Sequence, residues 1–82
     1  ILVRGGLVFD GDGGEGRPLD VLVEDGVIAR LAPHGALAAE GARVVDAAGA
    51  WVTPGFVDLH THYDAEIEVL PGLSESVRHG IT

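Results

Sequence analysis

The sequence predicts a mainly β fold, and three observations support that prediction. Short apolar runs alternate with turn residues through 1–53, which is typical of a meandering antiparallel sheet. A further strand-like segment, 56–62, carries ionisable side chains at every second position. A short helix is predicted over 73–79, because the glycine directly after it suits the left-handed residue that ends a helix. The chain is therefore expected to divide into a sheet portion, 1–53, and a βα segment, 54–82.

The first part of the sheet portion is expected to form three strands, at about 2–10, 20–24 and 27–31. A run of glycines and acids, 11–16, separates the first two strands, because glycine tolerates the positive φ of a flexible loop. The second and third strands meet across Glu24-Asp25-Gly26, where the glycine takes the left-handed position of a tight hairpin.

The third predicted strand has one face that is more apolar than the other. Because side chains alternate along a strand, Val27, Ala29 and Leu31 are expected to share one face. Ile28 and Arg30 are then expected on the opposite face. This pattern predicts half burial of the strand.

The remainder of the sheet portion is expected to be less regular. Residues 33–41 predict a loop with one helical turn, and 43–46 predict another short strand. Asp46-Ala47-Ala48-Gly49 has the residue preferences of a type I turn. Extended structure is expected to resume over 51–53, with Trp51 packing the sheet against whatever follows it.

Composition limits the class of protein. The formal charge of −8 repels the phosphates of nucleic acid and of anionic lipid, so neither nucleic acid nor a membrane is expected as a partner. The chain has no Cys, which excludes disulfides and thiolate metal sites. Its apolar start, 1–6, is interrupted by a charge and two glycines, so it predicts no signal peptide or membrane span, and a cytoplasmic protein is expected.

The size of the chain argues against an independent enzyme. A chain this short buries only about 60–65% of its unfolded surface, which makes its stability marginal. The sequence starts without Met and stops abruptly at Thr82, from which we expect both ends to have been cut from a longer chain.

The histidines of the strand-like segment are the residues with the clearest chemistry. On a β-strand, Asp58, His60 and His62 project from one side with successive members about 6.6 Å apart, so the two imidazoles can lean toward one zinc ion. Asp58 is expected to orient a ligating imidazole without binding the metal itself, and Asp64 to lie near the metal or the substrate. The alternative is that a His-x-His pair arose by chance on an exposed strand. No catalytic residue is assigned within this chain.

The other ionisable residues of interest are expected to be structural or solvated. His34 follows a proline in a loop, without a paired donor, and is expected to be a surface residue. His79 lies in the last turn of the predicted helix, where a cation caps free carbonyl groups. Three acids, Glu66, Glu68 and Glu75, are expected to form a solvated face.

The run from Val52 to His62, VTPGFVDLHTH, closely resembles the TPGFID-x-HTH segment of the amidohydrolase superfamily. This superfamily includes dihydroorotases, hydantoinases, imidazolonepropionases and D-aminoacylases. The resemblance implies that this segment is the first strand of a (β/α)8 barrel, and that His60 and His62 bind zinc, as one or two divalent ions in the complete protein. It also implies that 1–53 is a portion of an N-terminal β-sandwich.

Two further segments, 63–66 and 73–82, look most like the N-acyl-D-amino-acid deacylase (D-aminoacylase) branch, in which His-Thr-His-Tyr-Asp and Arg-His-Gly-Val-Thr runs recur. The resemblance implies hydrolysis of a small-molecule amide, an N-acyl-D-amino acid, by metal-activated water. The other ligands and the general base would belong to the missing remainder of the chain, so these 82 residues alone are expected to be inactive. The alternatives are a cyclic amide hydrolase, a non-catalytic β-sheet interaction module and a catalytically dead barrel used as a scaffold.

Overall fold

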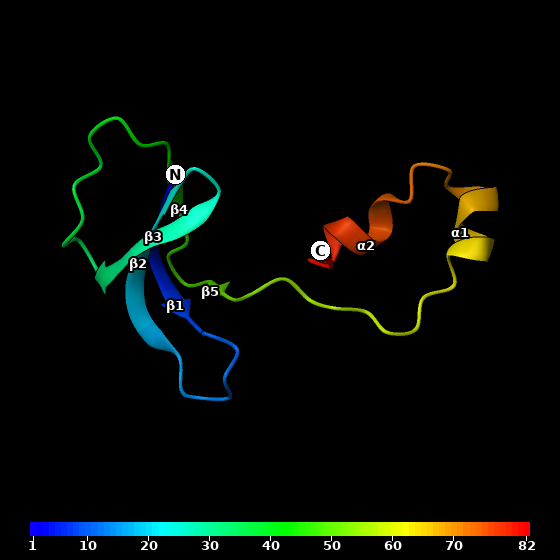
Figure 1. Ribbon diagram of the computed structural model, residues 1–82, viewed down its shortest axis with the longest axis horizontal. Helices are drawn as coiled ribbons and strands as arrows, with labels where there is room; N and C mark the ends of the chain where they lie inside the picture. The colour runs from blue at the N-terminus through cyan, green and yellow to red at the C-terminus, as the bar shows by residue number, and fades with distance from the viewer.

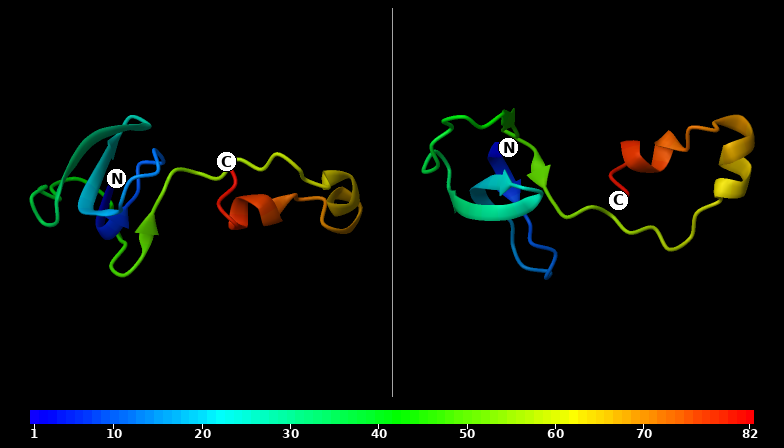
Figure 2. Two further views of the ribbon diagram at one scale, coloured as in Figure 1. Left: turned by 90° about the horizontal axis from the view of Figure 1, so that it is seen from below. Right: turned by 45° about the horizontal axis from the view of Figure 1, so that its top comes forward.

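The computed structural model describes all residues, 1–82, and shows a β-sheet and a helical part joined by an extended segment (Figures 1 and 2). The elements are β1 (Leu2–Val8), β2 (Arg17–Glu24), β3 (Val27–Pro33), β4 (Val44–Asp46), β5 (Trp51–Val52), α1 (Tyr63–Val69) and α2 (Ser74–Arg78). Neither helix contacts a strand of the sheet. The radius of gyration is 15.7 Å, whereas a compact chain of this length has about 12 Å, so the molecule is elongated. The predicted mainly β fold is confirmed, and the domain boundary at 53/54 stays a prediction.

The sheet has the strand order β3-β2-β1-β4, and β5 also pairs with β1. The β1–β2 and β2–β3 pairs are antiparallel, whereas β4 and β5 both run parallel to β1. The β2–β3 hairpin turns at Asp25 and Gly26, whose φ angles of 51° and 80° are both positive, as a type I′ turn requires. The predicted hairpin is confirmed, and both of its central residues are left-handed.

The faces predicted for β3 are wrong, because the strand contains a β-bulge. Leu22 pairs with Arg30, but Val23 pairs with Ile28, so Ala29 is one extra residue in β3. The insertion shifts the alternation, and Ile28 therefore shares a face with Leu31, as both line the same apolar hollow.

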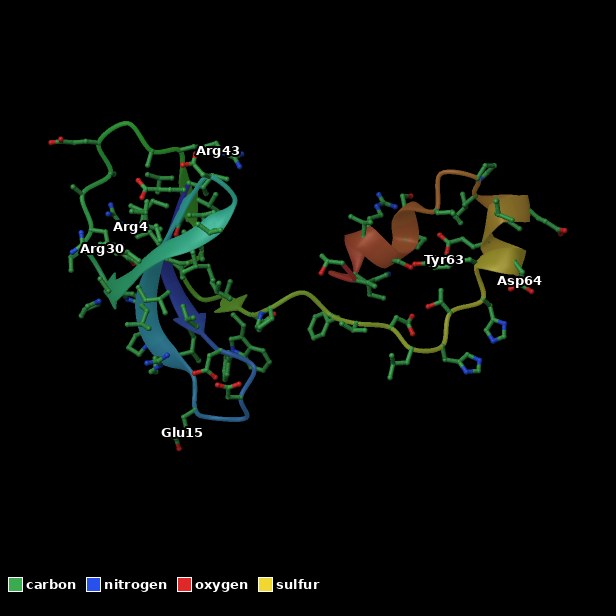
Figure 3. All side chains as sticks on the ribbon, in the orientation of Figure 1. Arg4, Glu15, Arg30, Arg43, Tyr63 and Asp64 are labelled. Carbon is green, nitrogen blue, oxygen red and sulfur yellow. The ribbon has the colours of Figure 1, made fainter.

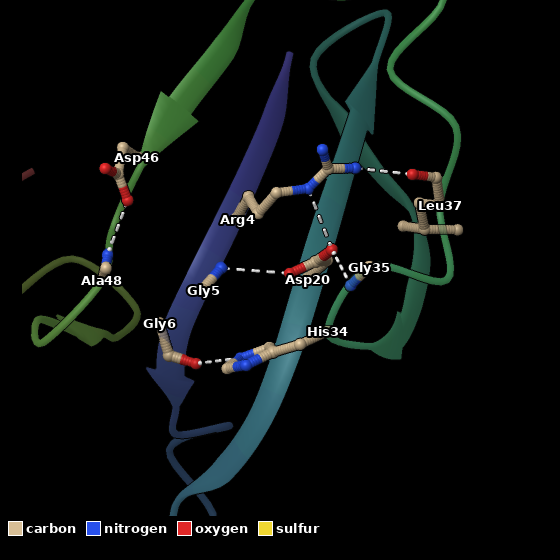
Figure 4. Close-up of polar contacts among 9 residues, drawn as sticks. All are labelled: Arg4, Gly5, Gly6, Asp20, His34, Gly35, Leu37, Asp46 and Ala48. Carbon is tan, nitrogen blue, oxygen red and sulfur yellow. Dashed lines mark hydrogen bonds and ion pairs between the residues drawn. The ribbon is translucent and has the colours of Figure 1, made fainter.

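A second bulge lies in β1 and is held by a buried carboxylate (Figure 4). Gly5 has a φ of 83°, and its N–H donates to Oδ1 of Asp20 at 3.0 Å. Oδ2 of Asp20 accepts from the N–H of Gly35 at 2.9 Å and from Nε of Arg4 at 3.3 Å. Burial raises the pKa of Asp20, but these three donors outweigh it, so that the pKa is lowered overall.

The segment between β3 and β4 is tied to the sheet by side-chain bonds and contains no helical turn, contrary to the prediction. Arg4 donates from Nη2 to the carbonyl of Leu37 at 2.6 Å, and the side chain of Leu37 is buried. Nε2 of His34 lies 3.0 Å from the carbonyl oxygen of Gly6, so the imidazole links the loop to β1 (Figure 4). The local chain geometry follows these long-range bonds and not the helix propensity of its alanines.

The small core lies between β1, β2 and the chain that follows β3. Gly6 lies in close contact with the part of that chain from Ala47 to Val52. A Cβ at Gly6 would lie 2.6 Å from Cγ2 of Val52 and 3.1 Å from Cβ of Ala47. We therefore expect Gly6→Ala to lower the free energy of unfolding by about 1–3 kcal/mol, because the added methyl group forces β5 away from β1. Urea unfolding monitored by circular dichroism measures this change.

Gly14 provides the matched control for that substitution. A Cβ at Gly14 would have no neighbouring atom within 4 Å, so Gly14→Ala is expected to change stability by less than about 0.5 kcal/mol. Equal effects of the two substitutions would show that the close approach of β5 to Gly6 does not exist in solution.

The helical part differs from prediction at its start and agrees at its end. In the segment predicted as a strand over 56–62, only Phe56 makes a β-bridge, parallel to Ile81, so the strand prediction is wrong for 57–62. The helix α1 was not anticipated, whereas α2 confirms the predicted helix to within one residue at each end. Gly80, with a φ of 82°, ends α2 as expected. Neither helix has the length or apolar character needed to cross a membrane.

Candidate metal centre

His60 and His62 bring their imidazole rings together in the segment that precedes α1. The two Nε2 atoms lie 3.0 Å apart, and the ring centroids are separated by 4.9 Å with 52° between the ring planes. His62 is also the residue directly before α1, so the beginning of the helix fixes its backbone. The pair predicted from the sequence therefore converges through the same nitrogen of each ring.

A bend, and not strand alternation, produces this convergence. Oδ1 of Asp58 accepts a hydrogen bond from the backbone N–H of His60 at 2.9 Å, two residues ahead, and this contact bends the chain. The Thr61 hydroxyl donates to the same carboxylate, and these two bonds, with that of Thr61 the stronger cause, lower the pKa of Asp58. Residues 57–62 have no strand partner in the ladder, so a local side-chain bond is free to set the backbone conformation.

The two nitrogens suit a tetrahedral zinc ion. Two ligands at about 2.0–2.1 Å from such an ion lie about 3.3 Å from each other, close to the 3.0 Å between the Nε2 atoms of His60 and His62. No group of three or more His, Asp or Glu side chains converges here or elsewhere in the chain. The residues present therefore fit two positions of a metal shell and leave the other positions to groups outside this chain.

The two carboxylates predicted near the metal, those of Asp58 and Asp64, make different contacts. Asp58 contacts the backbone of His60 and the side chain of Thr61, and no bond joins it to either imidazole. Asp64 lies in the first turn of α1 (Figure 3). Its Oδ1 is 3.9 Å from Nδ1 of His62. The sequence predicted Asp64 near the metal or the substrate, and its carboxylate lies beside the ring of His62.

The surroundings of the pair are acidic. Five carboxylates and one guanidinium occur between residue 54 and the end of the chain: Asp58, Asp64, Glu66, Glu68, Glu75 and Arg78. Such an excess of negative charge raises the local concentration of cations. The electrostatics of the segment therefore favour a metal ion and disfavour an anionic ligand.

The remaining sequence-predicted residues lie apart from the histidine pair. His34 is exposed, as expected, although it also contacts the carbonyl of Gly6. The imidazole of His79 lies 3.8 Å from the carboxylate of Glu75, which also pairs with Arg78 at 3.0 Å. Glu66 accepts a hydrogen bond from the N–H of Glu75 at 3.4 Å and so links the two helices.

Comparison with known proteins finds relatives along the whole chain. The chain is 54% identical over 83 residues to an uncharacterised protein of Mycobacterium tuberculosis, and covers 13% of it. It is 50% identical over 62 residues to a dihydroorotase of Geobacter sulfurreducens, a match that includes 76% of this chain and 14% of that protein. It is 37% identical over 87 residues to a dihydroorotase of Pelotomaculum thermopropionicum, which takes in all of this chain and 20% of that protein.

These matches test both the superfamily and the branch that the sequence resembles. The chain spans no more than a fifth of the length of these relatives. No family model matches it, and no solved structure matches it. The similarity to dihydroorotases supports the amidohydrolase superfamily as the family of this chain, and it does not support the D-aminoacylase branch.

Proposed function

We propose that this chain is the N-terminal part of a longer metal-dependent amidohydrolase, in which His60 and His62 bind a divalent cation. Zinc is the expected ion. The observation that carries the proposal is the 3.0 Å approach of the two Nε2 atoms. The similarity to dihydroorotases supports hydrolysis of a non-peptide C–N bond as the reaction class. A bound zinc ion supplies a Lewis acid that lowers the pKa of water toward about 7 and polarises an amide carbonyl.

The residues of this chain then have distinct tasks. His60 and His62 bind the cation, and Asp58 holds the bend that lets both rings reach it. The other ligands and the general base come from the remainder of the longer chain. Val57 and Leu59, 77% and 94% exposed, support this division, because apolar side chains next to a site call for further packing.

The favoured substrate is a cyclic amide. The names of the dihydroorotase relatives support this class. An N-acyl-D-amino acid is the second candidate, and the resemblance of 63–66 and 73–82 to deacylases supports it. In either case the proposed partner is a small molecule, because a charge of −8 disfavours nucleic acid and anionic membranes. The proposed location is the cytoplasm, with which a sequence that has no Cys agrees.

An assay of the longer protein tests both the metal dependence and the substrate class. Purified protein is incubated with dihydroorotate, with hydantoin and with a series of N-acetyl-D-amino acids, and ring opening or acetate release is measured. We expect turnover of a cyclic amide that a chelator abolishes and zinc restores, because the metal supplies the Lewis acid. The separate 82-residue chain is expected to give no turnover, because two ligands do not enclose the ion.

Three outcomes of this assay contradict the proposal in different ways. Release of acetate from N-acetyl-D-amino acids without any ring opening would replace the favoured substrate class by the second candidate. Chelator-resistant turnover would remove the metal from the mechanism. No turnover of any amide by metal-loaded protein would favour a non-catalytic β-sheet module.

A further inference from the structure

The contact between the two histidines constrains the positions of their protons. In a neutral imidazole one ring nitrogen is a donor and the other an acceptor. The 3.0 Å separation of the Nε2 atoms of His60 and His62 is a hydrogen-bond distance, so one Nε2–H donates and the other Nε2 accepts. The ring that accepts carries its proton on Nδ1, which is the tautomer that a metal bound at Nε2 requires.

Asp64 lies beside one ring of the pair only. Its Oδ1 is 3.9 Å from Nδ1 of His62, whereas Nδ1 of His60 has no carboxylate partner. The other acid near the pair, Asp58, is already bonded to the N–H of His60 and the hydroxyl of Thr61. The two rings are therefore inequivalent, and Asp64 is the group that makes them so.

We infer that Asp64 is a positioning residue, which holds the proton of His62 on Nδ1 and thereby presents the lone pair of Nε2 to the metal. This inference rests on the proposed function, because it assumes that His60 and His62 bind the cation through Nε2. Both partners are largely exposed, with 76% of the His62 side chain and 86% of the Asp64 side chain accessible, so either can rotate. A small rotation or one bridging water closes the separation, which is about 1 Å longer than a direct bond.

This role differs from that of a third ligand. Asp64 approaches the nitrogen of His62 that does not face His60, and no three donors converge. A carboxylate that accepts the second N–H of a metal-binding imidazole fixes its tautomer and orientation, and removal of such a partner weakens metal binding by about 10–100-fold. We expect the low end of that range here, because the pair is open to water.

Nitrogen NMR of the metal-free longer protein, with its histidines isotopically labelled, tests the inference without any activity measurement. We expect His62 to show protonated Nδ1 and His60 to show protonated Nε2 at a pH at which both rings are neutral. In Asp64→Ala the preference of His62 for Nδ1–H is expected to be lost, and the zinc dissociation constant to rise about tenfold. Asp64→Glu retains a carboxylate and is expected to recover part of both effects.

Glu68→Ala is the matched control, because it removes one exposed acid from the same helix without a contact to either histidine. It is expected to leave the tautomers and zinc affinity unchanged. If His60→Ala and His62→Ala weaken zinc binding while Asp64→Ala matches Glu68→Ala in both readouts, the role of Asp64 is overturned and the ligand pair stands. If neither histidine substitution weakens zinc binding, the proposed metal site itself fails.

Discussion

In the proposed longer amidohydrolase, replacing either His60 or His62 by alanine is expected to remove bound zinc and hydrolase activity together, with a loss of at least about 100-fold in kcat. Residues that only orient a metal ligand cost about 10–100-fold in affinity or activity, so loss of a ligand itself costs more. Both substitutions should remove metal, because the two Nε2 atoms approach the same point and each ring is expected to supply one ligand. Metal content by atomic absorption and kcat are measured on the same preparations.

His79→Ala is the control for loss of a histidine from the same part of the chain. Its imidazole lies 3.8 Å from a carboxylate of Glu75 and takes no part in the His60–His62 pair. We expect its metal content and kcat to equal those of the unsubstituted protein. Full metal occupancy in both His60→Ala and His62→Ala would reject the ligand assignment, whatever the activity.

The sequence was most informative where a residue has a strong local preference. The Asp25-Gly26 turn was predicted, because few residues other than glycine, Asn and Asp take positive φ readily. The end of α2 at Gly80 was predicted for the same reason. Both features depend on one or two residues and their own backbone, so no tertiary contact is needed to foresee them.

The two bulges could not be read from the sequence, because they depend on pairing between strands. Alternation along β3 fails at Ala29, where the partner strand supplies one residue fewer. In β1 the bulge at Gly5 depends on a carboxylate from β2. Asp20 looks like an ordinary polar residue of a strand until the register places it opposite an unpaired N–H.

The candidate site illustrates a correct residue choice with an incorrect local structure. His60 and His62 were selected because strand alternation would place both rings on one side, and the structure brings the rings together. The backbone that does so is bent by Asp58 and ends in α1, a helix that was not predicted from the sequence. A spacing of two residues is compatible with both conformations, so the spacing alone does not distinguish them.

Asp20→Ala is expected to lower the free energy of unfolding by about 3–5 kcal/mol, the largest stability effect of any substitution considered. The carboxylate is fully buried, and its removal leaves the N–H groups of Gly5 and Gly35 without acceptors and Arg4 without its counter-ion. A chain of 82 residues has a total stability of only about 4–12 kcal/mol, so this loss is a large part of the whole. Urea unfolding at pH 7 measures it.

The pH dependence of the free energy of unfolding distinguishes what the charge of Asp20 contributes from what the shape of its side chain contributes. The pKa of this carboxyl is lowered in the folded chain relative to its ordinary value of 3.8, so the folded state favours the ionised form. The stabilisation is therefore complete above about pH 4 and is lost as the pH falls through the lowered pKa. Asp20→Asn retains the shape without the charge, so the stability difference between it and the native chain should shrink as the pH falls from 7 toward 2.

Glu24→Gln, at an exposed acid of the same strand, is the control and is expected to change stability at pH 7 by less than about 0.5 kcal/mol. A difference between native chain and Asp20→Asn that stays constant down to pH 2 would mean that the network depends on the fit of the side chain and not on its charge.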